Sequence, residues 1–344
     1  MKVLKKYVVF LMISIITGGM ITSYFEEYQR SKLVPVRNLI VLGTWQSHSE
    51  DPIPVSRYRS GEGVNPVHVA ETVRDTALRI LEAQSDPAVI SPTEAQKLLD
   101  IADYFVETAQ DRRYHDSAFY VWTYDFDYPI YKLRALWISG MAQGHVIEVM
   151  LAAHAITGDE HYLEMARLAA NAMAVPIEYG GVAIDLSEGL WFEEYAQPGV
   201  TPPRVLNGHN FALSGLYYLS LADGDYRRLF DLGISGLESL LPEFDKRIWS
   251  MYDLQGIPAN RKYQRIHVMQ LRELYNRTER ERLLFYAQRF SIQLYFPFSA
   301  FYRVITYPNT FLVIILGGNI VVVFGLEVAG LFVFQRLKKS RRSR

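Results

Sequence analysis

The chain has 344 residues and a net charge of -1, with 36 lysines and arginines against 37 aspartates and glutamates. A charge so near zero argues against a nucleic-acid partner. The absence of cysteine excludes disulfides, thiolate zinc sites and cysteine nucleophiles, and the eight histidines show no metal-ligand spacing. We therefore expect no metal and no cofactor.

The N-terminal end predicts a membrane helix. Residues 1–6 are basic, and residues 7–25 form an uncharged apolar run long enough to cross the hydrocarbon core of a bilayer. A cleaved signal peptide is the competing interpretation. The run is longer than the usual apolar region of such a peptide, and no clear A-x-A cleavage site follows it. We expect an uncleaved anchor.

The C-terminal end carries a second apolar run, residues 311–334, which is interrupted by Asn319 and Glu327 and followed by a basic tail at residues 335–344. Basic flanks stay in the cytoplasm, so we expect both termini there and the segment between them on the other side of the membrane. A carboxylate is costly in lipid. Glu327 therefore faces a partner helix, lies near the interface or is a tolerated single polar residue.

Between the anchors the sequence predicts a linker, residues 26–64, and a helical domain, residues 65–300. Asn65 before a proline is typical of a helix start, and a capping box begins at Ser91. Helices with short Gly-Asp breaks follow, and Pro242 is expected to close one of them. These further helices are expected at 141–156, 160–174, 211–221, 226–241 and 279–294. The pattern predicts a mainly α fold, an α/α toroid of helical hairpins or an open part of one.

Aromatic, glycine-rich and proline-rich stretches lie between the helix pairs, at residues 119–131, 179–206 and 248–263. We expect these loops at one mouth of the toroid, where functional sites are usually built. Their tyrosines offer a flat apolar face and a polar tip, which suits sugar binding and also suits an ordinary core.

Short motifs run through these loops in a fixed order. They are W-x-E-E-Y at 191–195, V-L-N-G at 205–208, L-P-x-x-D at 241–245, Y-D-L at 252–254 and Y-x-x-x-H-x-x-Q-L at 263–271. Upstream stand W-I-S-G-M-A-Q-G at 137–144 and an aromatic stretch at 122–126. Together the motifs resemble the C-terminal catalytic domain of D-glucuronyl C5-epimerases over about residues 65–290.

The resemblance implies an isomerase that converts D-glucuronyl into L-iduronyl units by removing the C5 proton and returning it on the opposite face. Such chemistry needs a base, an acid and fixed donors for the enediolate charge. The catalytic residues that it implies are Tyr195, Tyr252, Tyr263 and Glu194. The residues that it implies for substrate binding are Asn207, His267, Tyr124 and Trp122.

A tyrosine hydroxyl titrates near 10, so it needs a nearby cation to act as a base. Arg261, Lys262 and Arg265 surround Tyr263 in the sequence, and we expect them to lower its pKa. In a chain with 23 tyrosines, ordinary packing is the competing interpretation of each one.

The chain departs from the family pattern within these motifs. The arginine and histidine expected after Y-D-L are replaced by Gln255 and Gly256, and a histidine expected after Tyr263 is replaced by Gln264. We expect Arg204 or Arg265 to replace the missing arginine at a substrate carboxylate. The β-rich N-terminal part of larger epimerases has no counterpart.

Three functions stay open at this point. The first is the epimerase; the second is a uronate lyase or glycoside hydrolase on the same fold; the third is an inactive polysaccharide-binding protein, which Gln255 and Gln264 favour. Asn207 as a helix cap and His267 as a core histidine are the competing interpretations within the motifs. The expected partners are a uronic-acid-containing polysaccharide and the lipid bilayer, and a homodimer is left open.

Overall fold

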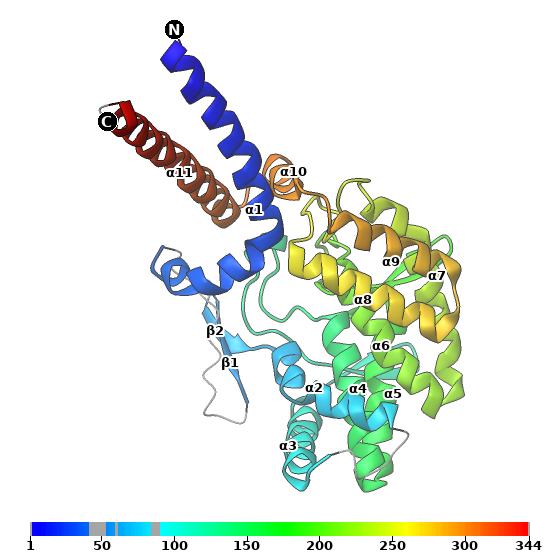
Figure 1. The fold of residues 1–344 in the computed structure, drawn as a ribbon. Coiled ribbons are helices and arrows are strands. Elements are labelled where there is room, and N and C mark those ends of the chain that lie inside the picture. Colours follow the sequence, from blue (N-terminus) through cyan, green and yellow to red (C-terminus); the bar gives the residue numbers. More distant parts are fainter. Residues whose placement is uncertain (1, 41–52, 59–60, 84–89, 343–344) are drawn as a thin grey trace.

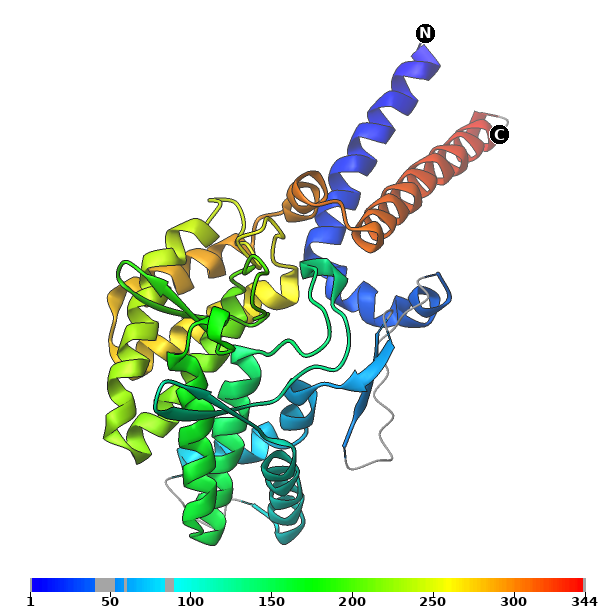
Figure 2. The ribbon, with the colours of Figure 1, turned by 180° about the vertical axis from the view of Figure 1, so that it is seen from behind.

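The computed structural model describes residues 2–40, 53–58, 61–83 and 90–342. This part of the chain is mainly helical, and its strands form three separate antiparallel pairs (Figure 1). The body helices cluster together, while the two terminal helices extend away from them side by side (Figure 2). The predicted helical class is confirmed, and its arrangement as an α/α toroid stays a prediction.

The body contains both predicted and additional elements. Its helices are α2 (Pro66–Glu82), α3 (Pro92–Thr108), α4 (Gly140–Thr157), α5 (Glu160–Asn171), α6 (Leu206–Ala222), α7 (Arg227–Phe244), α8 (Arg261–Thr278) and α9 (Glu281–Gln293). Its strands are β1 (Val55–Tyr58), β2 (Gly61–Val64), β3 (Gln110–Tyr114), β4 (Ser117–Val121), β5 (Ala183–Leu186) and β6 (Gly189–Phe192). Each predicted body helix is present with its ends shifted by a few residues, and α8 is an addition.

Local sequence explains where the helices begin and end. The side chain of Asn65 accepts hydrogen bonds from two backbone N–H groups of the first turn of α2, and Ser91 and Glu94 form the predicted capping box of α3. Helix α4 ends at Gly158, which takes a left-handed conformation with φ of 69°. Glycine tolerates this conformation, so the chain turns there into α5 and the predicted break is confirmed.

Helices α4 and α6 form the centre of the body and are buried on nearly every side. A helix that is mostly apolar and buried on every face belongs inside a core. The two cross at glycines, because a Cβ built on Gly215 would lie 2.4 Å from the carbonyl oxygen of Gly144. Helices α2 and α5 pack against α4. This arrangement fixes the first turn of α6 beside the segment that follows β6.

One predicted helix end and one competing interpretation are wrong. Helix α7 does not close at Pro242 but continues to Phe244, whose ring is fully buried and stacks on Trp191 with centroids 5.7 Å apart. A proline in the last turn removes one backbone hydrogen bond, and the buried phenylalanine offsets that loss. Asn207 is not a helix cap, because Val205 holds the N-cap position of α6.

Helix α8 has no counterpart among the predicted helices. Its first turns are rich in charge, which hides an apolar stripe that continues through Val268, Leu271 and Leu274. The start of α8 does carry a recognisable signal, since the side chain of Asn260 accepts a hydrogen bond of 3.0 Å from the backbone N–H of Tyr263. The helix matters for the site because Tyr263 stands in its first turn.

The terminal helices are α1 (Lys2–Ile40) and α11 (Thr310–Arg342), which pack antiparallel, and the short α10 (Ser299–Thr306) connects the body to α11 (Figure 1). Helix α1 runs past the predicted end of the first anchor. Residues 26–40 of the predicted linker are therefore helical, and residues 41–52 lie outside the described residues.

Both terminal helices are long and apolar enough to cross a membrane, by length and composition. The qualifying segments are Lys5–Leu33 and Thr310–Arg341, and they contain the predicted runs 7–25 and 311–334. This is consistent with membrane association. Which side of a membrane the body occupies stays a prediction.

Polar residues inside the two apolar runs face each other. Asn319 of α11 donates hydrogen bonds to Thr22 Oγ1 and Gln29 Oε1 of α1, at 2.9 and 3.1 Å. The hydroxyl of Ser14 donates to the carboxylate of Glu327 at 3.0 Å, so the interpretation that Glu327 faces a partner helix is confirmed. Hydrogen bonds between helices compensate polar groups that lipid cannot satisfy.

Candidate active site

A cavity of about 250 Å³ lies among the first turns of α2, α6 and α8 and the segments that follow β4 and β6. We call it the tyrosine cavity. Its walls are formed by Asn65, Val67, His68, Glu71, Tyr124, Phe126, Tyr128, Trp137, Ser139, Met141, Glu194, Tyr195, Asn207, Phe211, Lys262, Tyr263 and Ile266. The predicted catalytic residues Glu194, Tyr195 and Tyr263 meet there with the predicted substrate-binding residues Asn207 and Tyr124.

The segment after β6 is held in place by backbone hydrogen bonds. Ile138 and Ala196 exchange N–H···O bonds of 3.0 and 2.9 Å. The carboxylate of Glu193 points inward and accepts from the N–H groups of Tyr195 and Arg204, at 3.1 and 2.8 Å. Burial raises the pKa of Glu193 to about 7. Glu193 therefore shapes the loop that presents the next two side chains to the cavity.

Glu194 is the acidic residue of the predicted site. Its side chain is 8% exposed, and its Oε2 atom has no hydrogen-bond partner among the described residues. Burial raises the pKa of Glu194 to about 8; a hydrogen bond with Tyr195 opposes this shift, and the charge of Glu193 adds to it. A Cβ built on Gly208 would lie 2.2 Å from Glu194 Oε2, so the V-L-N-G motif needs a glycine there to make room for the carboxyl group.

Tyr195 lies in a cluster of aromatic rings. Its ring stacks on Tyr128 with centroids 5.0 Å apart and an interplanar angle of 3°, and the rings of Tyr131 and Trp137 lie 4.8 and 5.5 Å away. Burial, followed by the negative charge of Glu194, raises the pKa of Tyr195 well above its usual value. The hydroxyl of Tyr195 therefore keeps its proton at neutral pH.

Tyr263 and Tyr252 form a second pair, with ring centroids 4.7 Å apart. Tyr252 belongs to the loop before α8, where its backbone N–H donates to the carbonyl of Ile257 at 2.8 Å. Burial raises the pKa of both hydroxyls, and the charge of Glu194 raises it further. The prediction that basic neighbours lower the pKa of Tyr263 is therefore wrong.

The basic neighbours of Tyr263 point in different directions. Arg261 donates hydrogen bonds to backbone carbonyls of α1 and of the α9 end, at 3.0 and 2.9 Å. Arg265 forms an ion pair with Glu27 of α1. Lys262 alone of the three lines the tyrosine cavity, and its ammonium nitrogen lies 6.0 Å from the centroid of the Tyr263 ring. Arg261 and Arg265 are four residues apart and both contact α1, whereas Lys262 lies on another face of α8.

Four predicted substrate-binding residues lie outside the tyrosine cavity: Trp122, His267, Arg204 and Arg265. The indole N–H of Trp122 donates to a core backbone carbonyl at 3.0 Å, and His267 is fully buried 3.2 Å from a serine hydroxyl. Burial lowers the pKa of His267 to about 3, so its ring is neutral. Arg204 sits at a loop position with φ of 55°, and Arg265 is paired with α1. The order of the motifs does not reveal these directions.

Three polar residues that the sequence analysis did not assign to the site complete the cavity: Asn65, His68 and Glu71. The Nδ1 atom of His68 lies 2.7 Å from the hydroxyl oxygen of Ser56, and burial lowers the pKa of His68 to about 3. The only signal in this region is the helix start at Asn65. Nothing in that signal connects α2 to motifs far along the chain.

The two departures from the family pattern do not affect the walls of the tyrosine cavity. Gln264 is fully buried, and its amide donates to the carbonyl of Phe290 and to Gln293 Oε1, at 3.0 and 2.9 Å. Gln255 is exposed and donates to the carbonyl of Thr201 at 3.0 Å. Both glutamines therefore make hydrogen bonds within the structure, and neither lines the tyrosine cavity.

A second cavity, of about 320 Å³, lies where the body meets α1, α10 and α11. We call it the junction cavity. Tyr128, Tyr195 and Tyr263 line both cavities, and Tyr252, the fourth predicted catalytic residue, lines the junction cavity. The two cavities therefore adjoin at Tyr128, Tyr195 and Tyr263, which we call the tyrosine wall.

Comparisons with known proteins agree with the motifs. The family model described as D-glucuronyl C5-epimerase C-terminus matches residues 115–292. An uncharacterised protein of Methanocaldococcus jannaschii is 31% identical over 245 residues, which cover 67% of this chain and 77% of that protein. The D-glucuronyl C5-epimerase of Caenorhabditis elegans is 31% identical over 157 residues, which cover 40% of this chain and 25% of that enzyme.

Among solved structures, a protein of Listeria innocua is similar at a TM-score of 0.42 with 12% sequence identity. The similarity covers 66% of this chain and 57% of that one. It is too low to carry an argument about the fold.

Proposed function

This chain belongs to the D-glucuronyl C5-epimerase C-terminus family, and on that basis we propose that it is a uronyl C5-epimerase acting on a glucuronic-acid-containing polysaccharide. One observation carries the proposal: Glu194, Tyr195, Asn207 and Tyr263 come from three separate motifs and meet at one cavity. Residues that are scattered along a chain and converge on a concave, polar site are the usual mark of an active site.

Unpaired oxygens in the cavity wall support a sugar ligand. The Oε2 atom of Glu194 and the Oδ1 atom of Asn207 are buried, and neither has a hydrogen-bond partner within the described ranges. A buried acceptor without a donor is costly, and such atoms are rare outside functional sites. Sugar hydroxyl groups are donors of the right kind to satisfy both oxygens.

The proposed chemistry begins with the removal of the C5 proton. Tyr195 takes this proton and passes its own hydroxyl proton to the carboxylate of Glu194, so that one C–H bond breaks and Glu194 ends as the acid. A pKa of about 8 makes Glu194 a base suited to work near neutral pH. Lys262 and the Asn207 amide donate to the negative charge that develops on the substrate carboxylate.

The second half of the reaction returns a proton to the other face of C5. Tyr263, which comes from a different element than Tyr195, supplies this proton from its hydroxyl. Burial keeps that hydroxyl protonated beforehand, as an acid requires. Exchange of Glu194 and Tyr263 with solvent then resets the site, and no net proton is consumed.

We also propose that α1 and α11 cross a membrane, with both termini in the cytoplasm and the body, an α/α toroid or part of one, on the other side. The basic flanks at both ends support this orientation. A reporter fused after Arg344 should behave as cytoplasmic, and one inserted near Asp51 as exported. Recovery of the Asp51 insertion on the cytoplasmic side would contradict the orientation.

The test of the enzymatic proposal is solvent exchange at C5. The purified full chain in detergent micelles is incubated with glucuronic-acid-containing polymers in heavy water, and the sugars are analysed by NMR. Deuterium at C5 without an unsaturated product supports the epimerase. An unsaturated product identifies a lyase, a new reducing end without unsaturation identifies a hydrolase, and binding without exchange identifies a polysaccharide-binding protein.

A further inference from the structure

The junction cavity combines walls from the body with walls from the terminal helices. Tyr128, Tyr195 and Tyr263 form its body side, and Arg30 of α1 and Arg303 of α10 contribute from the other side. Because the same three tyrosines line the tyrosine cavity, any ligand in the junction cavity lies directly behind the wall of the proposed active site.

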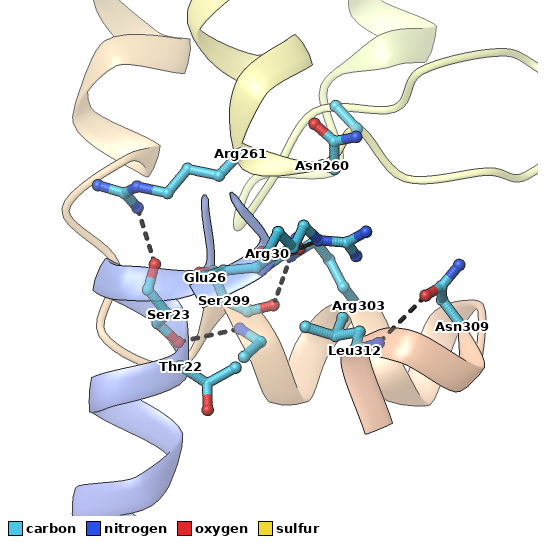
Figure 3. A network of polar contacts seen from close by, with 12 residues as sticks. Thr22, Ser23, Glu26, Arg30, Asn260, Arg261, Ser299, Arg303, Asn309 and Leu312 are labelled. Atoms are coloured by element: carbon cyan, nitrogen blue, oxygen red, sulfur yellow. Dashed lines mark hydrogen bonds and ion pairs between the residues drawn. The ribbon is translucent and has the colours of Figure 1, made fainter. Parts of the chain in front are cut away.

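Within the described ranges, two charged residues line the junction cavity, and both are arginines: Arg30 and Arg303. They share a single counter-charge, Glu26 of α1: Arg30 Nε lies 2.7 Å from one carboxylate oxygen of Glu26 and Arg303 Nη2 lies 2.6 Å from the other. Figure 3 shows the three side chains converging at the contact between α1 and α10. Two cations against one anion leave one positive charge in surplus.

Of the two arginines, Arg30 is better placed than Arg303 to bind an anion of a ligand. Arg303 is 2% exposed and its guanidinium also lies 5.3 Å from the Trp249 ring centroid, so it is held within the structure. The guanidinium of Arg30 also lies over a ring, 5.0 Å from the Phe311 centroid, but its side chain is 30% exposed. It uses Nε for Glu26, which leaves its two terminal amino groups outside that ion pair. A planar pair of amino groups is suited to bidentate recognition of a carboxylate or sulfate.

The contact between the terminal helices and the body is rigidly built. The Ser23 hydroxyl accepts from the backbone N–H of Ala300 at 3.0 Å, and the Ser23 carbonyl accepts from Arg261 at 3.0 Å (Figure 3). Arg261 begins α8, the helix that carries Tyr263. The helix with Arg30 is thereby fixed against the helix with a proposed proton carrier, as a shared binding site requires.

We propose that the junction cavity is a second saccharide subsite, which binds an acidic sugar unit next to the reacting uronate through Arg30, with Arg303 reinforcing its positive potential. The inference rests on the proposed function, because it takes the polysaccharide as the ligand. A glucuronic-acid polymer repeats its carboxylate along the chain, so a unit in the junction cavity offers a second anion to the two arginines that share Glu26. The terminal helices then form part of the substrate site in addition to anchoring it.

The test compares two probes on the full chain in nanodiscs of zwitterionic phosphatidylcholine. The short probe is a disaccharide with one glucuronate, and the long probe is a hexasaccharide with three. The variants are Arg30→Gln, Arg30→Lys and the matched control Arg227→Gln. Arg227 pairs with Asp231 on α7 and lines neither cavity, so its removal subtracts the same charge elsewhere.

Wild type should bind the long probe more tightly than the short one. Arg30→Gln should weaken the long probe about tenfold to a hundredfold, as expected for a lost hydrogen bond to a charged group, and should leave the short probe within about twofold. The affinity of Arg30→Lys for the long probe should lie between those of wild type and Arg30→Gln, because lysine keeps the charge and loses the bidentate geometry. Arg227→Gln should match wild type. An Arg30→Gln variant that weakens both probes equally, or neither, overturns the subsite.

Two further arms separate the alternatives. If anionic phosphatidylserine in the nanodisc stabilises wild type against unfolding more than Arg30→Gln, while both proteins show the same affinity for the long probe, the cavity binds a lipid headgroup and the saccharide assignment is overturned. Solvent exchange at C5 is measured in parallel. A length preference without exchange supports the subsite and rejects the epimerase, whereas exchange without a length preference rejects the subsite and supports the epimerase.

Discussion

The two cavities share a wall of tyrosines and differ in chemistry and in origin. Glu194, Asn207 and Tyr263 lie within the segment that the family model matches, whereas Arg30 and Arg303 lie outside it. The tyrosine cavity contains a carboxyl group and hydroxyls whose protons are held by burial; the junction cavity contains arginines around one buried carboxylate. We therefore assign proton transfer to the tyrosine cavity and recognition of a second charge to the junction cavity. Substitutions in one cavity can be tested without changing the residues of the other.

The largest effect is expected from removing a proton carrier of the tyrosine cavity. Tyr263→Phe and Glu194→Gln should each slow C5 exchange by about a hundredfold to ten-thousandfold, the usual loss when general acid–base catalysis is removed. Deuterium incorporation measured by NMR reports the rate. Tyr179→Phe is the control, because this tyrosine is 61% exposed and lines neither cavity. A Tyr263→Phe variant with the wild-type rate would reject the proposed acid.

The next largest effect is expected at Gly208. A Cβ there would lie 2.5 Å from Glu194 Cβ, so Gly208→Ala must displace the carboxyl group from its position in the wall. We expect exchange to fall at least about tenfold and stability to fall by about 1–3 kcal/mol, as for other overpacked sites. Gly224→Ala is the matched control, since nothing lies within 4 Å of its added Cβ. Equal rates for the two variants would contradict the role of Gly208.

The fold was predictable where a signal is local. The cap at Asn65, the capping box at Ser91 and the glycine turn at Gly158 each act within one turn of helix, and each predicted boundary holds. Helix α8 was missed because burial of its apolar stripe depends on packing against α9, the next helix, and against α6, which lies far away in the sequence. The predicted end of α7 at Pro242 was wrong for a similar reason: tertiary packing buries the ring of Phe244 and extends the helix beyond the proline.

The order of the motifs predicted which residues belong to the site, but not where each side chain points. The order of motifs identified Glu194, Tyr195 and Tyr263 together, and the structure brings them to one cavity. It did not reveal the direction of each side chain, so Arg265 was taken as a substrate ligand although it faces α1. The contribution of Arg30 depends on how a terminal helix folds back on the body, which no local pattern records.

A smaller effect, with opposite signs in two measurements, is expected from pH. Because the pKa of Glu194 is about 8, its base form should increase as pH rises, and exchange should climb about fivefold from pH 7 to pH 8. Stability should move the other way. The pKa of Glu194 is higher in the folded protein than the ordinary value of 4.5, which applies to the unfolded chain. The folded state therefore gains stability at low pH, and this contribution disappears as pH rises towards 8.

Thermal unfolding of wild type and Glu194→Gln separates this group from Glu193, which titrates in the same range. The melting temperature of wild type should fall between pH 5 and pH 8 more steeply than that of the variant. Parallel curves for the two proteins would show that Glu194 keeps an ordinary pKa and is already ionised at neutral pH.

The smallest effect is expected at the contact between the terminal helices. Asn319→Leu removes three hydrogen bonds, one to Thr22 and two with Gln29, and because such bonds contribute about 0.6 kcal/mol each within membranes, the total loss should be about 2 kcal/mol. Unfolding in mixed micelles measures this loss of stability. Val322→Leu is the control, because Val322 of α11 is 61% exposed. Asn319 lines neither cavity, so C5 exchange should stay within about twofold of wild type. A collapse of exchange in Asn319→Leu would mean that the packing of α1 on α11 sets the geometry of Tyr195 and Tyr263, and the two sides of the tyrosine wall could then not be treated as independent.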